Sequence, residues 1–212
     1  MEKKIRRIFV SICIVTGIAL LAVPFFYPFY CQNETDKLIE QFEKTLEDNE
    51  DETEESKEEG KEQTSLSEED AALLSGEDVI GIIEIEAIDI RYPISEGAGN
   101  SQIRYAIGHM TETAGLGEKG NCVLCGHNGS RNGTFFTNLN QLSAGDKVKI
   151  TDKRGEVHIY EVADTSVIDP YDNTVKNQSD EEILTLLTCA NKGTKRFVCR
   201  CIPVKEAGDV DE

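Results

Sequence analysis

Positively charged residues are scarce in this sequence. Its 212 residues include 22 Lys or Arg against 40 Asp or Glu, a formal net charge of −18. Most of that charge lies between residues 34 and 78, where 19 acidic residues accompany only 4 lysines, a net of −15. Because nucleic acids are bound through cationic contacts to phosphate, a segment of this kind disfavours nucleic acid as a partner.

Histidine is also scarce, which limits the choice of a general base. His109, His127 and His158 are the only imidazoles in the chain. A calcium loop of the EF-hand type is missing as well, because the acidic stretch 164–180 lacks the D-x-D-x-D-G pattern. We therefore interpret that stretch as a wall of a substrate cleft and expect no cofactor; calcium bound by the acids of this loop is the alternative.

Charged residues are absent from residues 8–30. At about 1.5 Å per helical residue this run is long enough to cross a hydrocarbon core of roughly 30 Å. Basic residues precede it in the tail 1–7 and aromatic residues crowd its far end, which predicts a cytoplasmic N-terminus and an extracellular remainder. No small-residue A-x-A site follows the run, so we favour a retained single-pass membrane anchor over a cleaved signal peptide.

Residues 31–78 form an acidic, low-complexity region that cannot bury enough apolar surface to order itself fully. Two short helical pieces are expected within it: Leu38, Ile39, Phe42 and Leu46 recur at helical spacing, and Ser67 with Asp70 forms a capping-box signal. We interpret the region as a solvated stalk that holds the following domain off the membrane, and an acidic binding site is the alternative. Residues 206–212 are read as an acidic tail.

Residues 79–205 change character, into short apolar or alternating runs separated by Gly, Asn and Asp. The candidate strands are VIGIIEIE, IDIRYPI, NCVLCG, KVKI, EVHIYEVADTSVI, ILTLLTC and RFVCRCIPV. Only the stretches 134–142 and 179–182 look helical. Many short strands with few helices predict a mainly β protein, a single closed or nearly closed barrel with short helices.

Three functional groups fall where candidate strands begin or end. Cys189 closes the run ILTLLTC beside the polar loop ANKGTK, a position where a thiol is accessible. Arg196 opens the next strand and would lie near that thiol if the two strands pair, where a guanidinium can stabilise an oxyanion. His127 follows the glycine at the end of NCVLCG. The three groups are predicted to converge on one pocket.

Taken together, GNCVLCGH, TLLTC and an arginine opening a final strand as RFV resemble the sortases, the membrane-anchored cysteine transpeptidases of Gram-positive bacteria. The resemblance covers residues 79 to about 204 and includes GHMTETAGLGEKGN before the histidine and FFTNLNQLSAGDKVKI after it. It implies a sortase-type barrel of about eight strands. The approach to the histidine is most similar to class D enzymes, and NGTFFTNLNQL is also compatible with class B.

The resemblance implies a role for each residue. Cys189 matches the nucleophile, His127 the catalytic histidine, and Arg196 the arginine that holds the substrate and the developing oxyanion. Thr188 and His109 are expected near the substrate. The implied reaction is cleavage of an LPxTG-like sorting signal after its threonine through a thioester, followed by transfer to an amine acceptor such as a cell-wall precursor.

Alternatives remain for one residue and for the function. Arg200 lies on the same face of the strand as Arg196, but the family pattern favours Arg196. A papain-like peptidase is disfavoured because there the nucleophile precedes its histidine and opens a helix, whereas here His127 precedes Cys189. A membrane-tethered, non-catalytic domain that binds a wall polymer is the second alternative.

The C-x-x-C spacing of NCVLCGHN suggests a metal knuckle or a redox pair. Side chains alternate along a strand, so Cys122 and Cys125 should point to opposite faces and can neither share one ion nor form a disulfide without distortion. We interpret both thiols as core fillers. Cys199 and Cys201 share a face, but a disulfide between them on one regular strand is not expected. His158, in an alternating strand, is predicted to be a surface or edge residue.

Overall fold

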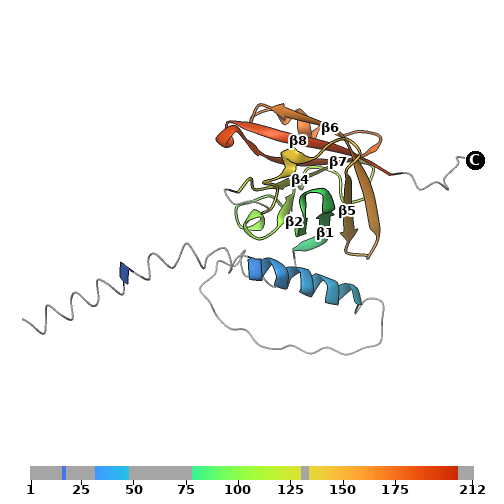
Figure 1. Cartoon of the computed structure of the whole chain (residues 1–212). Coiled ribbons are helices and arrows are strands. Elements are labelled where there is room, and N and C mark those ends of the chain that lie inside the picture. The colour runs from blue at the N-terminus through green and yellow to red at the C-terminus, as the bar shows by residue number, and fades with distance from the viewer. Residues whose placement is uncertain (1–15, 18–31, 48–77, 130–133, 205–212) are drawn as a thin grey trace, which may run out of the picture.

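The computed structural model describes residues 16–17, 32–47, 78–129 and 134–204. Within these residues, eight strands close into a barrel in the order β1-β2-β3-β4-β7-β8-β6-β5 (Figure 1). The strands are β1 (Val79–Ile85), β2 (Ile90–Glu96), β3 (Ile107–His109), β4 (Gly120–Gly126), β5 (Lys147–Asp152), β6 (Val157–Ile168), β7 (Glu182–Ala190) and β8 (Lys195–Pro203). Short 3-10 helices are η1 (Glu86–Ile88), η2 (Gln102–Arg104), η3 (Leu139–Gln141), η4 (Asn173–Lys176) and η5 (Asn191–Gly193).

The predicted barrel is confirmed, and each of the seven candidate strands corresponds to a strand. β3 was missed because three residues are too few to show an alternating pattern. The stretch 134–142 contains only the 3-10 turn η3, and the helical prediction for 179–182 is wrong: β7 begins there, and the nearby helical turn is η4. Ser, Asp and Glu favoured a helix start locally, but pairing with β4 fixes this segment as the beginning of β7.

The barrel core lies on the inner face of the strands. Period-two alternation places Leu124 of β4, Leu186 of β7 and Cys199 of β8 inside, each fully buried. Burying a leucine side chain contributes about 1.5–3 kcal/mol. β4 and β7 are parallel, and β7 and β8 are antiparallel. The residues that alternate with these three along β4, β7 and β8 therefore face away from the core and together form one outer surface.

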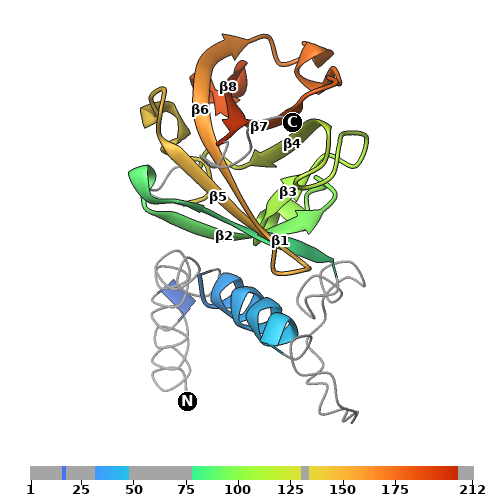
Figure 2. The same ribbon diagram turned by 90° about the vertical axis from the view of Figure 1, so that its right-hand side faces the viewer.

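A helix over residues 32–47 lies against the β1 side of the barrel (Figure 2). Its apolar stripe of Leu38, Ile39 and Phe42 packs on Val79, Ile82 and Tyr105. Thr35 Oγ1 donates a hydrogen bond to the Tyr105 carbonyl at 3.1 Å, and Arg91 of β2 pairs with Glu43. The helical spacing in this acidic region therefore corresponds to a helix that is docked on the barrel.

The remaining expectations for the N-terminal part concern residues that the structure does not describe. The predicted span 8–30 falls outside the described residues except for residues 16–17, as do most of the acidic region and the tail 206–212. Within the part of the chain that is described, no helix is both long and apolar enough to cross a membrane. The anchor therefore stays a prediction from the sequence.

Candidate active site

The three predicted catalytic residues lie in one row across neighbouring strand ends. Cys189 of β7 is directly opposite Arg196 of β8. Directly opposed residues in an antiparallel pair have Cβ atoms about 4.5–5.5 Å apart and project from the same face. On the other side, the parallel ladder of β4 and β7 ends at the pair Gly126 and Thr188, so His127 follows as the neighbour of Cys189. Chain segments more than sixty residues apart thus bring the imidazole and the thiol together.

Two side-chain hydrogen bonds extend the β4–β7 ladder around this row. Thr188 Oγ1 donates to the Gly126 carbonyl at 2.8 Å, immediately before His127. Asn128 Nδ2 donates to the Cys189 carbonyl at 2.7 Å, immediately after it. These bonds flank the histidine on both sides and fix the end of β4 against the end of β7. Thr188 is buried and points to the face opposite Cys189, so it acts on the site through the backbone.

Aromatic contacts position the histidine ring from the other side. The His127 and Phe135 rings meet edge to face, with centroids 6.0 Å apart and an interplanar angle of 77°. Phe135, which has a positive φ of 47°, in turn stacks on Tyr92 at 4.8 Å. Gly126 is required directly before the histidine, because a Cβ there would lie 2.7 Å from Ile107 Cδ1. These contacts fix the position of the His127 side chain.

Arg196 is half-buried and held by the loop that joins β7 to β8. Its Nη1 donates to the carbonyls of Gly193, at 3.0 Å, and Lys195, at 3.1 Å. A guanidinium carries five N–H donors in a fixed fork, so these two bonds leave other donors of the fork directed elsewhere. The arrangement is suited to stabilising a negative oxygen near Cys189.

The outward face of β4, β7 and β8 continues from the catalytic row as an apolar patch. We call it the outer-face cluster; its buried members are Val123, Leu187 and Val198, with Met110, Cys125, Ile168 and Val175 packed against them. The segment between β6 and β7 forms one wall, because Asn121 Nδ2 donates to the carbonyls of Val175 and Asn177. Lys176 pairs with Glu112 from the β3–β4 connection. The segment between β6 and β7 and the β3–β4 connection therefore border the outer-face cluster, and the interpretation of 164–180 as a substrate-cleft wall stays a prediction.

Two acidic side chains of the segment between β6 and β7 stabilise its turns. Asp172 caps η4 by accepting a hydrogen bond from Thr174 N at 2.9 Å, and this bonding with Thr174 lowers the Asp172 pKa. Asp169 accepts from Tyr171 N at 3.2 Å and pairs with Lys195. The carboxylates of Asp172 and Asp169 thus already have hydrogen-bond or ion-pair partners.

The cysteines divide between the two faces. Cys122, Cys199 and Cys201 are buried in the barrel core. Burial raises the pKa of Cys122 to about 12. The sulfurs of Cys199 and Cys201 lie 3.8 Å apart, and both residues are free thiols. Cys125 is half-buried in the outer-face cluster, and burial raises its pKa to about 11. The opposite orientation of Cys122 and Cys125 is confirmed. The core-filler interpretation is right for Cys122; Cys125 packs instead, half-buried, against the outer-face cluster, because alternation turns its side chain outward.

A second hollow adjoins the catalytic row on the inner side. We call it the mouth pocket: a cavity of about 490 Å³ lined by Asn128, Thr137, Asn140, Val167, Thr188, Cys189, Ala190, Asn191 and Phe197. Val167, Phe197 and Thr188 are successive neighbours across β6, β8 and β7, so they share the inner face behind the catalytic row. Cys189 therefore stands on the rim between the outer-face cluster and the mouth pocket.

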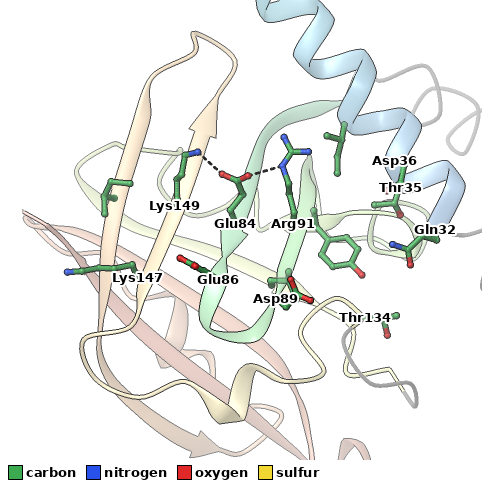
Figure 3. Close-up of a pocket in the computed structure, with 14 residues that line it drawn as sticks. Gln32, Thr35, Asp36, Glu84, Glu86, Asp89, Arg91, Thr134, Lys147 and Lys149 are labelled. Atoms are coloured by element: carbon green, nitrogen blue, oxygen red, sulfur yellow. Dashed lines mark hydrogen bonds and ion pairs between the residues drawn. The ribbon is translucent and has the colours of Figure 1, made fainter.

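The largest of the described cavities lies elsewhere. This helix-side pocket, about 850 Å³, is bordered by the 32–47 helix, β1, β2 and β5. Its cations are paired: Glu84 bonds Lys149 at 2.7 Å and Arg91 at 2.8 Å (Figure 3). Neither Cys189 nor His127 lines it.

Neither of the other histidines joins the row. His109 is buried on β3 opposite Leu124, hence on the inner side, with Nε2 donating to the Ala114 carbonyl at 2.9 Å and Nδ1 facing Glu96 at 3.1 Å. His109 therefore lies on the face of the sheet opposite the catalytic row, and its proximity to a substrate stays a prediction. His158 is partly buried beside Asp152, Nε2 to Oδ2 3.4 Å, rather than at a free surface.

Among the described residues, one group has the composition of a metal site: Asp152, Glu156 and His158, with ligand atoms within 4.8 Å of one another. Asp152 is already bonded by the Arg154 side chain at 2.8 Å and by the backbone N–H groups of Arg154 and Glu156. An arginine on the carboxylate explains the group as an ion-paired turn between β5 and β6.

Three residues at the site escaped the sequence reasoning. Asn128 was visible only as the residue after GH, and its bond to the Cys189 carbonyl depends on strand pairing. Phe135 was part of a stretch read as helical, although its contact with His127 depends on a turn with positive φ. Cys125 could have been placed outside by the same alternation that separated it from Cys122.

Comparisons with known proteins agree with this geometry. Residues 83–204 match the Sortase domain family model. A Sortase A of Bacillus anthracis is 26% identical over 199 residues, 93% of each chain. A Sortase D of Bacillus subtilis is 32% identical over 110 residues, 51% of this chain and 53% of the relative. The structure of a Clostridium perfringens Sortase D5 transpeptidase superposes with a TM-score of 0.63 at 30% identity, covering 82% of this chain and 99% of that one. Because these relatives carry both A and D designations, the class D resemblance stays a prediction.

Proposed function

The chain belongs to the sortase family, whose members are cysteine transpeptidases, and from that premise we propose that it cleaves an LPxTG-like sorting signal after threonine and transfers the acyl part to an amine. The observation that carries the proposal is the row of His127, Cys189 and Arg196 at adjoining strand ends. A thiol that closes a strand after its histidine in the chain does not fit a papain-like site.

In the proposed first step, the thiolate Sγ of Cys189, whose proton is held by His127, attacks the threonine carbonyl carbon and a C–S bond forms. The carbonyl oxygen becomes an oxyanion that Arg196 stabilises, which is where a preorganised donor contributes most to rate. The C–N bond then breaks, and His127 supplies the proton that the departing amine needs. The product is a thioester on Cys189.

In the second step an acceptor amine attacks the thioester carbon. The new C–N bond forms as the C–S bond breaks, the thiolate of Cys189 is restored, and the amine loses its proton through His127. The outer-face cluster lies beside the catalytic row, and because Val123, Leu187 and Val198 are buried, the members left to contact the Leu-Pro part of such a signal are its partly buried ones, such as Met110, Ile168 and Val175.

The test uses residues 32–204 and a panel of Leu-Pro-Xaa-Thr-Gly peptides. Intact-protein mass spectrometry should show a thioester adduct on the protein and peptide cleavage between Thr and Gly. Cys189→Ala should abolish both, and Cys125→Ala, which changes a thiol on the same face, should retain both. An uncleaved panel, or cleavage that survives Cys189→Ala, would refute the proposal.

The proposed location is the outer surface of the cell membrane, with residues 8–30 as the anchor. The support is the uncharged run and its basic N-terminal flank. Fractionation of cells that express the full chain should place it in the membrane pellet, whereas a chain starting at residue 32 and directed to secretion should be released. Release of the full chain would contradict the anchor.

A further inference from the structure

We propose that Asn121 is a positioning residue: it holds the segment between β6 and β7 as the wall along which the acyl part of the substrate binds. This inference rests on the transpeptidase function proposed above. Asn121 is the second residue of β4 and precedes His127 by six residues. At about 3.3 Å per strand residue the two lie roughly 20 Å apart, so Asn121 is out of reach of the reacting atoms. Its effect on the reaction must pass through the segment that it holds.

The side-chain amide of Asn121 joins that segment to the barrel. The residue is buried, with 5% of its surface exposed. Its Nδ2 group donates one hydrogen bond to the Val175 carbonyl at 2.7 Å and another to the Asn177 carbonyl at 3.2 Å. Its Oδ1 accepts from Thr185 Oγ1 of β7 at 2.7 Å. Because a carbonyl can only accept, the NH₂ end of the amide must face the segment, where both of its N–H groups are used.

The main chain of Asn121 is bonded to the same segment. Its N–H donates to Gln178 Oε1 at 3.0 Å, and its carbonyl accepts from Gln178 Nε2 at 3.1 Å. The preceding glycine makes room for this contact: a Cβ at Gly120 would lie 2.7 Å from Gln178 Oε1, and the φ of +120° also favours glycine. Four hydrogen bonds therefore connect Asn121 to residues 175–178.

These bonds position one border of the outer-face cluster. Val175 packs against the cluster, and a cavity of about 390 Å³ that Val175, Thr185 and Val198 help to line lies beside it. Val198 also belongs to the cluster, so the cavity continues the cluster away from Cys189. Thr185 precedes Cys189 by four residues, about 13 Å along β7, which is the span of about four extended peptide residues. The residues before the threonine of the substrate therefore reach the wall.

A wall that is formed before the substrate arrives lowers the free-energy cost of binding. If the substrate had to order the segment, part of the binding free energy would be lost to the conformational entropy of the segment. Removing the bonds should therefore weaken binding and raise KM, while the chemical step at Cys189 stays nearly unchanged. A wall held by the amides of the chain itself also needs no bound ion, so chelation of calcium should not raise KM.

Three substitutions remove the bonds in different ways, and a fourth is a matched control. Asn121→Ala removes the whole amide, and Asn121→Asp keeps an acceptor for Thr185 but loses both donors to the carbonyls. Because Asn121 is buried, Gln178→Ala provides a second route from an exposed position. The control is Asn177→Ala: it changes an exposed neighbour whose bond to Asn121 uses the main-chain carbonyl, which alanine keeps.

The experiment uses the full chain in detergent and a peptide of the Leu-Pro-Xaa-Thr-Gly panel that the unchanged protein cleaves. Steady-state cleavage gives kcat and KM, in calcium and in EDTA. Alkylation of Cys189 by iodoacetamide, a probe too small to need the wall, reports the reactivity of the thiol, and peptide mapping assigns the alkylated residue. Amide hydrogen exchange of residues 169–181 reports whether the segment has been released from the barrel.

We expect KM to rise about tenfold in Asn121→Ala and Asn121→Asp and at least threefold in Gln178→Ala. In all three variants kcat and the alkylation rate should stay within twofold, and amides of residues 173–178 should exchange at least tenfold faster while those of β8 do not change. Asn177→Ala should match the unchanged protein in every measurement.

The inference is overturned if KM stays unchanged in Gln178→Ala and in the folded Asn121 variants, or if Asn177→Ala raises KM equally. A loss of kcat and of thiol alkylation without a change in KM would also overturn it, because Asn121 would then act on the catalytic row. A KM of the unchanged protein that rises tenfold in EDTA would show that an ion forms the wall instead. If the unchanged protein cleaves no peptide, the proposed function fails and this inference fails with it; cleavage with an unaltered KM in the variants refutes this inference alone.

Discussion

The helix-side pocket and the mouth pocket differ in what their polar groups do. In the larger one, of about 850 Å³, Lys149 and Arg91 are both bonded to Glu84, so each of these cations already has an acidic partner (Figure 3). In the smaller one, of about 490 Å³, the polar side chains are uncharged and the rim carries the thiol. The difference teaches that the size of a hollow does not identify the site; strand ends that bring a nucleophile, a base and a cation together do.

After Cys189→Ala, Arg196→Ala should show the largest effect on acylation, since it removes the one cation of the catalytic row. Loss of an oxyanion donor typically lowers rate by about 10²–10³-fold, or about 2.7–4 kcal/mol. The measurement is single-turnover acylation by a cleavable sorting-signal peptide. The control is Arg200→Ala, because Arg200 is on the same face of β8 but opposite Thr185, four residues from the thiol on β7. Equal losses in the two variants would contradict the assignment to Arg196.

Leu38→Ala should lower the free energy of unfolding and leave the rate of acylation nearly unchanged. Leu38 is fully buried between the helix and the barrel, and truncating a buried leucine costs about 2–3 kcal/mol at the low end of measured cases. Urea unfolding reports the loss, and acylation by the folded protein should change less than twofold. Lys44→Ala, at an exposed position of the same helix, should change neither. A tenfold loss of acylation in folded Leu38→Ala would erase the contrast between the two regions.

The sequence predicts the catalytic residues better than it predicts the docking of the helix, and the reason is physical. His127, Cys189 and Arg196 could be placed because each stands where an alternating run meets a polar loop, a signal contained in a few neighbouring residues. The docking of the 32–47 helix on the barrel could not be predicted. The acidic composition around Leu38 favours a solvated segment, and the surface on which the helix packs is formed by residues distant in sequence, such as Tyr105. Asn128 required the parallel register of β4 and β7, which no local pattern encodes.

Asn128→Ala should slow acylation about tenfold, because one hydrogen bond that holds a reacting strand end contributes about 1–1.5 kcal/mol. Asn128→Asp keeps the shape but loses the N–H donor, so it should behave like the alanine variant. Asn140→Ala removes an amide of the same pocket that has no described bond to Cys189, and it should leave acylation within twofold. The readout is the acylation rate as a function of pH, with thermal unfolding to show that both variants fold. If Asn128→Ala acylates normally across the pH range, the hydrogen bond from Asn128 to the Cys189 carbonyl does not position the thiol.

Tyr92 gives the smallest expected effect and tests the aromatic path from the helix-side pocket to His127. It lines the helix-side pocket and stacks on Phe135, whose ring meets His127. An aromatic pair contributes about 0.5–1.5 kcal/mol beyond burial, so Tyr92→Leu should lower acylation about two- to threefold by loosening Phe135. Tyr92→Phe retains the ring and should acylate like the unchanged protein. If the phenylalanine variant loses as much as the leucine variant, the hydroxyl matters rather than the stack. If neither changes the rate, the position of His127 is set from the β4 side alone, by Gly126 and the bonds of Thr188 and Asn128, and the helix-side pocket has no route to the chemistry through Phe135.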